Sequence, residues 1–157
     1  MTLLKAKSHR LPGRERERGQ SSIEFALSII VVMFILACCW EVLMAVYTAN
    51  VLGDAAKEGV RYAIVHGANS TQCSGPNAAT PCAYDPDKLK VISRVTDYGH
   101  ASLHDISAMS VTVTYPDGTN DAPNRVVVTV TYTYLPYVNL SFFHPVLITH
   151  AQGRIVF

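Results

Sequence analysis

The sequence predicts an α+β fold of one domain, in which a long, partly transmembrane N-terminal helix packs on a small antiparallel β-sheet with one additional short helix. Three observations predict it. An apolar run extends from Ile23 to Tyr47, apolar residues then recur every three to four positions, and an alternation with a period of two begins near residue 109. A chain of 157 residues has room for one modest core once an anchor is subtracted.

The apolar run is long enough to cross a bilayer as a helix. The hydrocarbon core needs about twenty residues at about 1.5 Å each, and we assign the transmembrane helix to residues 20–47. Trp40 and Tyr47 suit the far membrane interface. Glu41 is then expected near the outer headgroups, where its carboxylate reaches water rather than lipid.

A basic leader precedes this helix over residues 1–19, with six lysines and arginines against two glutamates. A basic flank beside an apolar helix is retained in the cytoplasm, so residues 48–157 are expected to form an extracytoplasmic domain. Binding of nucleic acid by the same arginines is disfavoured, because the cluster is short, lacks interleaved aromatic residues and is followed at once by lipid-compatible sequence. The pattern predicts a single-pass membrane protein with a cytoplasmic N-terminus.

The helix is predicted to continue outside the membrane over residues 48–66. No proline or turn cluster interrupts it, so we expect one helix from about Ser21 to His66, closed by Gly67. A stripe of small residues allows close packing, and the sequence leaves open whether it faces this chain's own sheet or another subunit. The stripe comprises Ala49, Gly53, Ala56, Gly59 and Ala63.

A loop rich in Asn, Ser, Thr, Gly and Pro is predicted over residues 68–84. Cys73 and Cys82 lie within it and can close a short loop. We expect a disulfide between them, because an oxidising compartment would not leave two surface thiols free for long. Two free thiols are the alternative.

A short second helix is predicted over residues 86–98. Asp85 is a good N-cap residue, Pro86 suits the first helical position, and Gly99 is expected to end the helix.

Three strands are predicted after this helix, over residues 109–115, 125–134 and 147–157. The first two form a hairpin in which valine or tyrosine alternates with threonine. The third is expected to form a strand pair or an edge strand that is broken near Gly153. Four tyrosines of this region are candidates for a sugar-binding or surface-binding patch, although tyrosines at this spacing are more often half-buried strand residues: Tyr115, Tyr132, Tyr134 and Tyr137.

The segment that carries functional information is RERGQSSIEFAL, from Arg16 to Leu27. It resembles the processing site of type IV pilin-like proteins, in which a prepilin peptidase cuts after a glycine and leaves a glutamate at the fifth mature position. The matching cut lies between Gly19 and Gln20, and the fifth residue is Glu24. The pair formed by Glu24 and Phe25, together with the later sequence AAKEGVRYA and the C-terminal valine, threonine and tyrosine strands, is similar to the TadE and TadG pseudopilins of tight-adherence (Flp-type) pilus systems.

This resemblance implies a pilin-like fold and a structural role in the bacterial inner membrane. The expected partners are a prepilin peptidase, other pilins or copies of this chain bound through the N-terminal helix, and membrane lipid; nucleic acid is not expected. Cleavage would create an α-amino group at Gln20, and Glu24 lies one helical turn further on. Glu24 could then neutralise that amine or the amine of a neighbouring subunit, and Phe25 is assigned to assembly by the resemblance alone. We expect neither an enzyme nor a bound cofactor or metal.

Several alternatives remain at this stage. Ser21 to Glu24 is also a Ser-x-x-Glu capping box, which needs no peptidase. A secretory signal peptide cut near Ala45 to Ala49 would give the same export. A tethered binding module that keeps its leader is a further possibility. A metal site at His100 and His104 is disfavoured, because Gly99 makes a helix doubtful there and no HExxH motif or cysteine partner is present.

Overall fold

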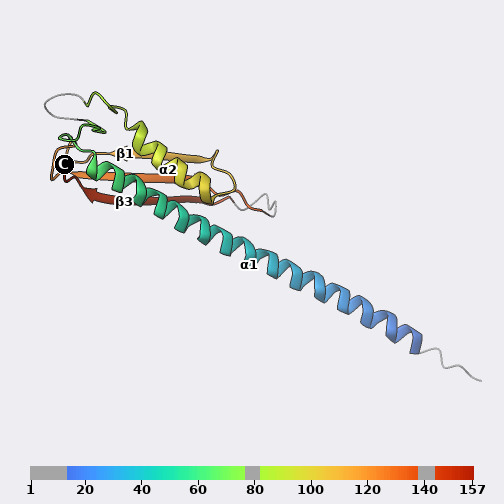
Figure 1. The fold of residues 1–157 in the computed structure, drawn as a ribbon. Coiled ribbons are helices and arrows are strands. Elements are labelled where there is room, and N and C mark those ends of the chain that lie inside the picture. Colours follow the sequence, from blue (N-terminus) through green and yellow to red (C-terminus); the bar gives the residue numbers. More distant parts are fainter. Residues whose placement is uncertain (1–13, 77–81, 138–143) are drawn as a thin grey trace, which may run out of the picture. The chain divides into compact units, whose positions relative to one another are not determined.

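The computed structural model describes residues 14–76, 82–137 and 144–157, with side chains from Gly19 onward. It contains two helices, α1 (Arg14–Val65) and α2 (Leu89–Ser102), followed by three strands, β1 (Met109–Thr114), β2 (Arg125–Thr133) and β3 (Val146–Arg154) (Figure 1). This confirms the α+β class. Most of the predicted leader, residues 1–13, lies outside the described part. The chain divides into two compact units, residues 1–40 and 41–157, which we describe separately.

Helix α1 begins earlier than the sequence suggested. It starts at Arg14 rather than near Ser21. The Arg and Glu residues before Gly19 are good helix formers, and the single glycine is not enough to stop the helix. Ser21 is therefore an interior residue of the helix. The interpretation of Ser21 to Glu24 as a capping box is wrong for the intact chain, since an N-cap lies outside the helix it caps.

In the first unit, the apolar side chains of α1 are exposed. Those from Ile23 to Trp40 include Phe25, which is 68% exposed, and Trp40, which is 56% exposed. Of the described helices, α1 is long and apolar enough to cross a membrane. A stretch with this much uncovered apolar surface is unusual for a monomer in water and marks a surface that contacts lipid or protein.

The second unit contains a three-stranded antiparallel sheet in the order β1-β2-β3 (Figure 1). Val128 of β2 stands opposite Val113 of β1 and Ala151 of β3. Because neighbouring strand residues point to opposite faces, one face of the sheet carries the buried valines and the other carries the threonines. The buried positions of β2 are Val126, Val128, Val130 and Tyr132.

Both helices contribute to one core against this valine face. Leu52 and Ala56 of α1 and Val91 and Val95 of α2 are fully buried in the same hydrophobic cluster as Val128. The periodicity predicted for residues 48–66 is thus the packing face of α1. The chain end lies beside this helix, since the backbone N–H of Val156 donates to the carbonyl of Ile64 at 3.0 Å.

Two glycines allow the helices and the sheet to approach each other closely. A Cβ on Gly59 would lie 2.5 Å from Cγ2 of Val95, and one on Gly153 would lie 2.6 Å from Cγ1 of Val60. Strand β3 lies at an edge of the sheet and ends at Arg154, one residue after Gly153, which agrees with the expected edge strand that breaks near this glycine. The glycine also lets the strand approach α1.

The end of α1 also differs from expectation. The helix ends at Val65, and Gly67 does not take the left-handed conformation of a helix cap. A Cβ there would collide with the backbone oxygens of Phe157 and Asn120. Gly67 is required because two other segments pass against it.

Helix α2 starts three residues later and ends four residues later than predicted. Pro86 lies in a turn, Lys88 takes a left-handed backbone conformation with φ of 62°, and the helix begins at Leu89. Asp85 still caps it, since its carboxylate accepts the backbone N–H groups of Leu89 at 2.7 Å and Lys90 at 3.0 Å. Gly99 does not end the helix, which runs on to Ser102.

A disulfide and a buried hydrogen bond hold the segment between the helices in place. A disulfide joins Cys73 and Cys82, whose Cα atoms are 5.7 Å apart. The hydroxyl of Ser74 donates to the Asp85 carboxylate at 2.6 Å. Residues 77–81 of the predicted loop 68–84 lie outside the described residues.

Candidate functional site

The segment from Gly19 to Phe25 lies on the exposed surface of α1. A Cβ placed on Gly19 would meet no atom within 4 Å. The side-chain amide of Gln20 donates to the Glu24 carboxylate at 3.1 Å, and Ser28 donates its hydroxyl to the Glu24 carbonyl at 2.8 Å. The two residues that the sequence analysis connected through the i, i+4 spacing therefore face each other.

This arrangement has a simple chemical consequence. A carboxylate one turn from a helix start is favoured by the helix dipole, and it also lies near any positive charge placed at residue 20. The Glu24 carboxylate is directed to Gln20 in the intact chain. Phe25 makes no comparable polar link, and its ring is left exposed for an apolar contact.

A second polar group lies where the folded unit begins. Glu41 is 2% exposed, and its carboxylate accepts the hydroxyl of Tyr134 at 2.9 Å and the backbone N–H of Tyr137 at 3.3 Å. The expectation that Glu41 reaches water is wrong. The chain supplies donors to the carboxylate instead, which removes most of the cost of burying a charge.

Burial raises the pKa of the Tyr134 phenol above its ordinary value of 10.0, and the hydrogen bond to the neighbouring Glu41 carboxylate raises it further. Tyr134 therefore stays protonated and remains a donor to Glu41. The bond joins the end of β2 to the first turn of α1 in this unit.

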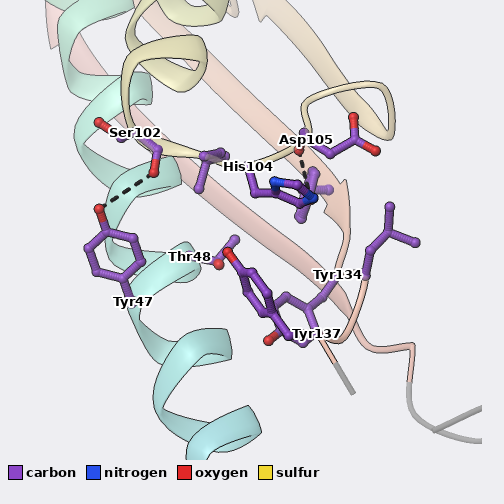
Figure 2. Close-up of a pocket in the computed structure, with 10 residues that line it drawn as sticks. Tyr47, Thr48, Ser102, His104, Asp105, Tyr134 and Tyr137 are labelled. Atoms are coloured by element: carbon purple, nitrogen blue, oxygen red, sulfur yellow. Dashed lines mark hydrogen bonds between the residues drawn. The ribbon is translucent and has the colours of Figure 1, made fainter. Parts of the chain in front are cut away.

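A small cavity of about 20 Å³ lies beside this bond (Figure 2). Tyr47 reaches from α1 to donate its hydroxyl to the carbonyl of Ser102 at 3.5 Å, and Figure 2 shows Tyr134 and Tyr137 on the other side of the cavity. A space of this size holds at most about one water molecule. It is a packing feature and not a ligand site.

Sequence reasoning missed the pairing of Glu41 with Tyr134. The only sign of this pairing in the sequence is that Glu41 lies inside an apolar run, because a buried carboxylate needs a hydrogen-bonding partner. Nothing in the local sequence identifies a tyrosine 93 positions later as that partner.

Three of the four candidate tyrosines, Tyr132, Tyr134 and Tyr137, line the small cavity, whose volume of about 20 Å³ leaves no room for a sugar. Tyr115 donates its hydroxyl to the Ser74 carbonyl, Tyr132 to the Asp105 carbonyl and Tyr134 to Glu41. Tyr137 is 53% exposed. Three of the four hydroxyls thus hold the chain's own segments together.

The small-residue stripe is divided between two environments. Ala56 and Ala63 are fully buried in the core, and Gly59 packs against both α2 and the sheet. Gly53 has open space beside it. The outer part of the stripe therefore serves this chain's own fold.

The described residues include no group of three or more His, Cys, Asp and Glu side chains that could hold a metal ion. His100 lies in the last turn of α2, whereas His104 lies beyond its end with its ring 5.8 Å from that of Tyr137. The structure does not place both histidines on one helical face.

Comparison with known protein families gave a match to the N-terminal part of the chain. Residues 19–61 match the model of a family described as TadE-like protein. This stretch is less than a third of the chain, and it contains both the Gly19–Phe25 segment and the helix through Arg61. The match confirms the resemblance to TadE. No curated protein and no solved structure matches the chain.

Proposed function

We propose that this chain, whose residues 19–61 are TadE-like, is a membrane-anchored pseudopilin or minor pilin of a tight-adherence pilus, processed after Gly19 and assembled through its N-terminal helix. The family match supports an association with such a pilus. The observation that carries the proposal is the uncovered apolar surface of α1 from Ile23 to Trp40.

The length of that surface supports a membrane anchor. A helix from Gln20 to Trp40 is about 30 Å long at about 1.5 Å per residue, which equals the thickness of a hydrocarbon core. From Glu41 onward α1 belongs to the folded unit. We therefore place the outer membrane boundary near Trp40, a few residues before the boundary at residue 47 that hydropathy suggested.

The basic leader supports a cytoplasmic N-terminus and hence an extracytoplasmic position for residues 41–157. The disulfide between Cys73 and Cys82 suits that side of the membrane, since such bonds persist in oxidising compartments.

Processing after Gly19 is supported by the position of this glycine. It lies on an open surface, and glycine is the residue of this stretch that least favours the helix. A peptidase could therefore unwind the backbone locally at a modest cost.

Glu24 is the residue on which assembly would depend. Once Gln20 is the first residue, its amine and the Glu24 carboxylate lie one turn apart, and a carboxylate buried among apolar helices needs a cationic partner. In a bundle of subunits, the amine of a neighbouring chain can serve as that partner. Glu24 would then fix the axial register of each incoming helix.

This role is tested by replacing Glu24 with Gln in cells that form the pilus. We expect the Glu24→Gln variant to remain in the membrane and to be processed. The amount of cross-linked oligomer should fall to less than about a tenth of the wild-type amount, because an unpaired buried amine is costly. Glu58→Gln is the matched control, since Glu58 is a carboxylate of the same helix that pairs with Arg61 at 3.6 Å. Normal ladders with Glu24→Gln would overturn the register role.

A further inference from the structure

An open groove of about 470 Å³ lies at the far end of the folded unit, between the last turns of α1, the segment after the disulfide and α2. Its volume falls in the range of about 300 to 1,000 Å³ that is usual for small-ligand sites. It shares no residue with the Gly19–Phe25 segment or with the cluster around Glu41. The side chains that carry the argument are Tyr62, His66, Tyr84, Lys90, Arg94 and Asp97.

Two cations of this groove form no ion pair within the described part of the chain. Lys90 and Arg94 lie one turn apart on α2, and among the described residues neither forms an ion pair, whereas Lys57, Arg61 and Arg125 each do. Like charges at this spacing repel each other. An anion bound between them would relieve that repulsion.

Arg94 is held in position by an aromatic stack. Its guanidinium carbon lies 5.5 Å from the centre of the Tyr62 ring, and that ring stacks on His66 at 3.9 Å. Nδ1 of His66 lies 2.7 Å from the Tyr62 carbonyl, and because a carbonyl only accepts, Nδ1 is the donor of this hydrogen bond. The contact favours one position of the guanidinium before any ligand arrives, which reduces the entropy lost on binding.

The rim of the groove is amphipathic. Gln72 and Tyr84 line it on either side of the disulfide between Cys73 and Cys82. The Tyr84 side chain is 48% exposed, so its ring can pack against an apolar ligand surface while its hydroxyl stays in water. Asp97 lies near the cations and accepts the hydroxyl of Ser93 at 3.2 Å.

We propose that this groove binds a carboxylate-bearing saccharide. Lys90 and Arg94 hold the carboxylate, the Tyr84 ring packs against a sugar ring, and Asp97 accepts a sugar hydroxyl. A polyacidic peptide fits less well, because it carries several carboxylates against two cations and one aspartate, and no strand edge lines the groove to bind its backbone. The groove lies about 30 Å along α1 from Glu41, and is therefore clear of a bilayer that ends near Trp40.

The test uses the full chain in detergent micelles, titrated with a uronic-acid trisaccharide and followed by calorimetry and by amide chemical shifts. We expect saturable binding, with shifts confined to the last turn of α1, the segment around Tyr84 and α2. The neutral trisaccharide of the same linkage should bind about tenfold more weakly or not at all, because it lacks the charge-assisted hydrogen bonds. Absence of binding by the uronic-acid trisaccharide would overturn the proposal.

Variants distinguish specific binding in the groove from a general attraction of the anionic ligand to positive charge. Lys90→Gln and Arg94→Gln change exposed side chains, and each should weaken binding about tenfold. Tyr84→Ala should weaken it without changing the net charge. Arg154→Gln, which removes an exposed cation outside the groove, should bind as wild type. Equal weakening by Arg154→Gln would overturn the proposal, and so would equally tight binding of inorganic phosphate alone or of an oligoglutamate peptide.

Discussion

Glu41 shows most clearly how a single residue can contradict a pattern that is otherwise correct. Hydropathy assigned it to the end of a membrane helix, where carboxylates usually reach water. In the structure the folded unit already begins at this residue, and the carboxylate is buried against Tyr134 and the backbone of Tyr137. The sequence could predict the anchor but not this contact, since it depends on a strand far along the chain.

Removing the Tyr134 hydroxyl should destabilise the folded unit. Tyr134→Phe takes one donor from a buried carboxylate, which costs about 1 to 3 kcal/mol of unfolding free energy. Chemical denaturation in detergent measures the loss. Tyr137→Phe is the control, because Tyr137 is exposed and its hydroxyl forms no hydrogen bond in the described structure. Equal loss in the two variants would show that the bond to Glu41 contributes nothing specific.

The hairpin contains a group whose titration affects stability. Asp117 accepts the Arg125 guanidinium at 2.7 Å and 3.1 Å and the Arg125 backbone N–H at 2.8 Å. These hydrogen bonds lower the pKa of the Asp117 carboxyl from 3.8 to about 2. Because the folded pKa is the lower one, the stabilisation is present above about pH 4 and is lost as the pH falls toward 2.

Asp117→Asn should therefore flatten the fall in melting temperature between about pH 4 and pH 2, since the variant has no carboxylate to protonate. Arg125→Met should flatten it only partly, because the backbone N–H of residue 125 still donates to Asp117. Melting curves over this pH range check both. An unchanged slope in Asp117→Asn would contradict the assignment.

At the scale of elements, the sequence predicted which segments form helix and strand, and its errors lie at glycines and helix ends. Periodicity identified the buried face of α1 and the alternation of β2. It treated Gly99 as the end of α2, whereas the helix runs through this glycine to Ser102 and the glycine permits close packing against Met109. A local pattern shows that a glycine weakens an element, but only the tertiary structure shows what passes beside it.

Gly59 tests the close contact between α1 and the rest of the core. Gly59→Ala places a methyl group 2.5 Å from Cγ2 of Val95, which is buried and stiff because it is β-branched. We expect a loss of about 1 to 3 kcal/mol of unfolding free energy from overpacking.

Gly53→Ala is the matched control for that variant. It lies in the same helix with no atom within 4 Å of its added Cβ, so it should stabilise the protein by about 0.5 to 1 kcal/mol through helix propensity alone. Thermal melts of the two variants should move in opposite directions. Stabilisation of both would mean that the packing at Gly59 is loose.

At the scale of the whole molecule, the sequence carried much of the functional hypothesis. The apolar run and the Gly19–Phe25 segment led to an anchored, pilin-like protein, and the match over residues 19–61 supports the same family. The groove around Arg94 was not predictable, because its side chains come from three segments that only the fold brings together. The segment after the disulfide carries no periodicity from which its position could be inferred.

The central claim is that the mature chain begins at residue 20 and keeps its apolar helix. Intact-mass analysis of protein extracted from membranes of cells with an active prepilin peptidase tests this most directly. We predict a mass that corresponds to residues 20–157, with Gln20 free or cyclised and two hydrogens lost at the disulfide. A mass that includes the leader from Met1, or one that lacks the apolar segment through Trp40, would contradict the account.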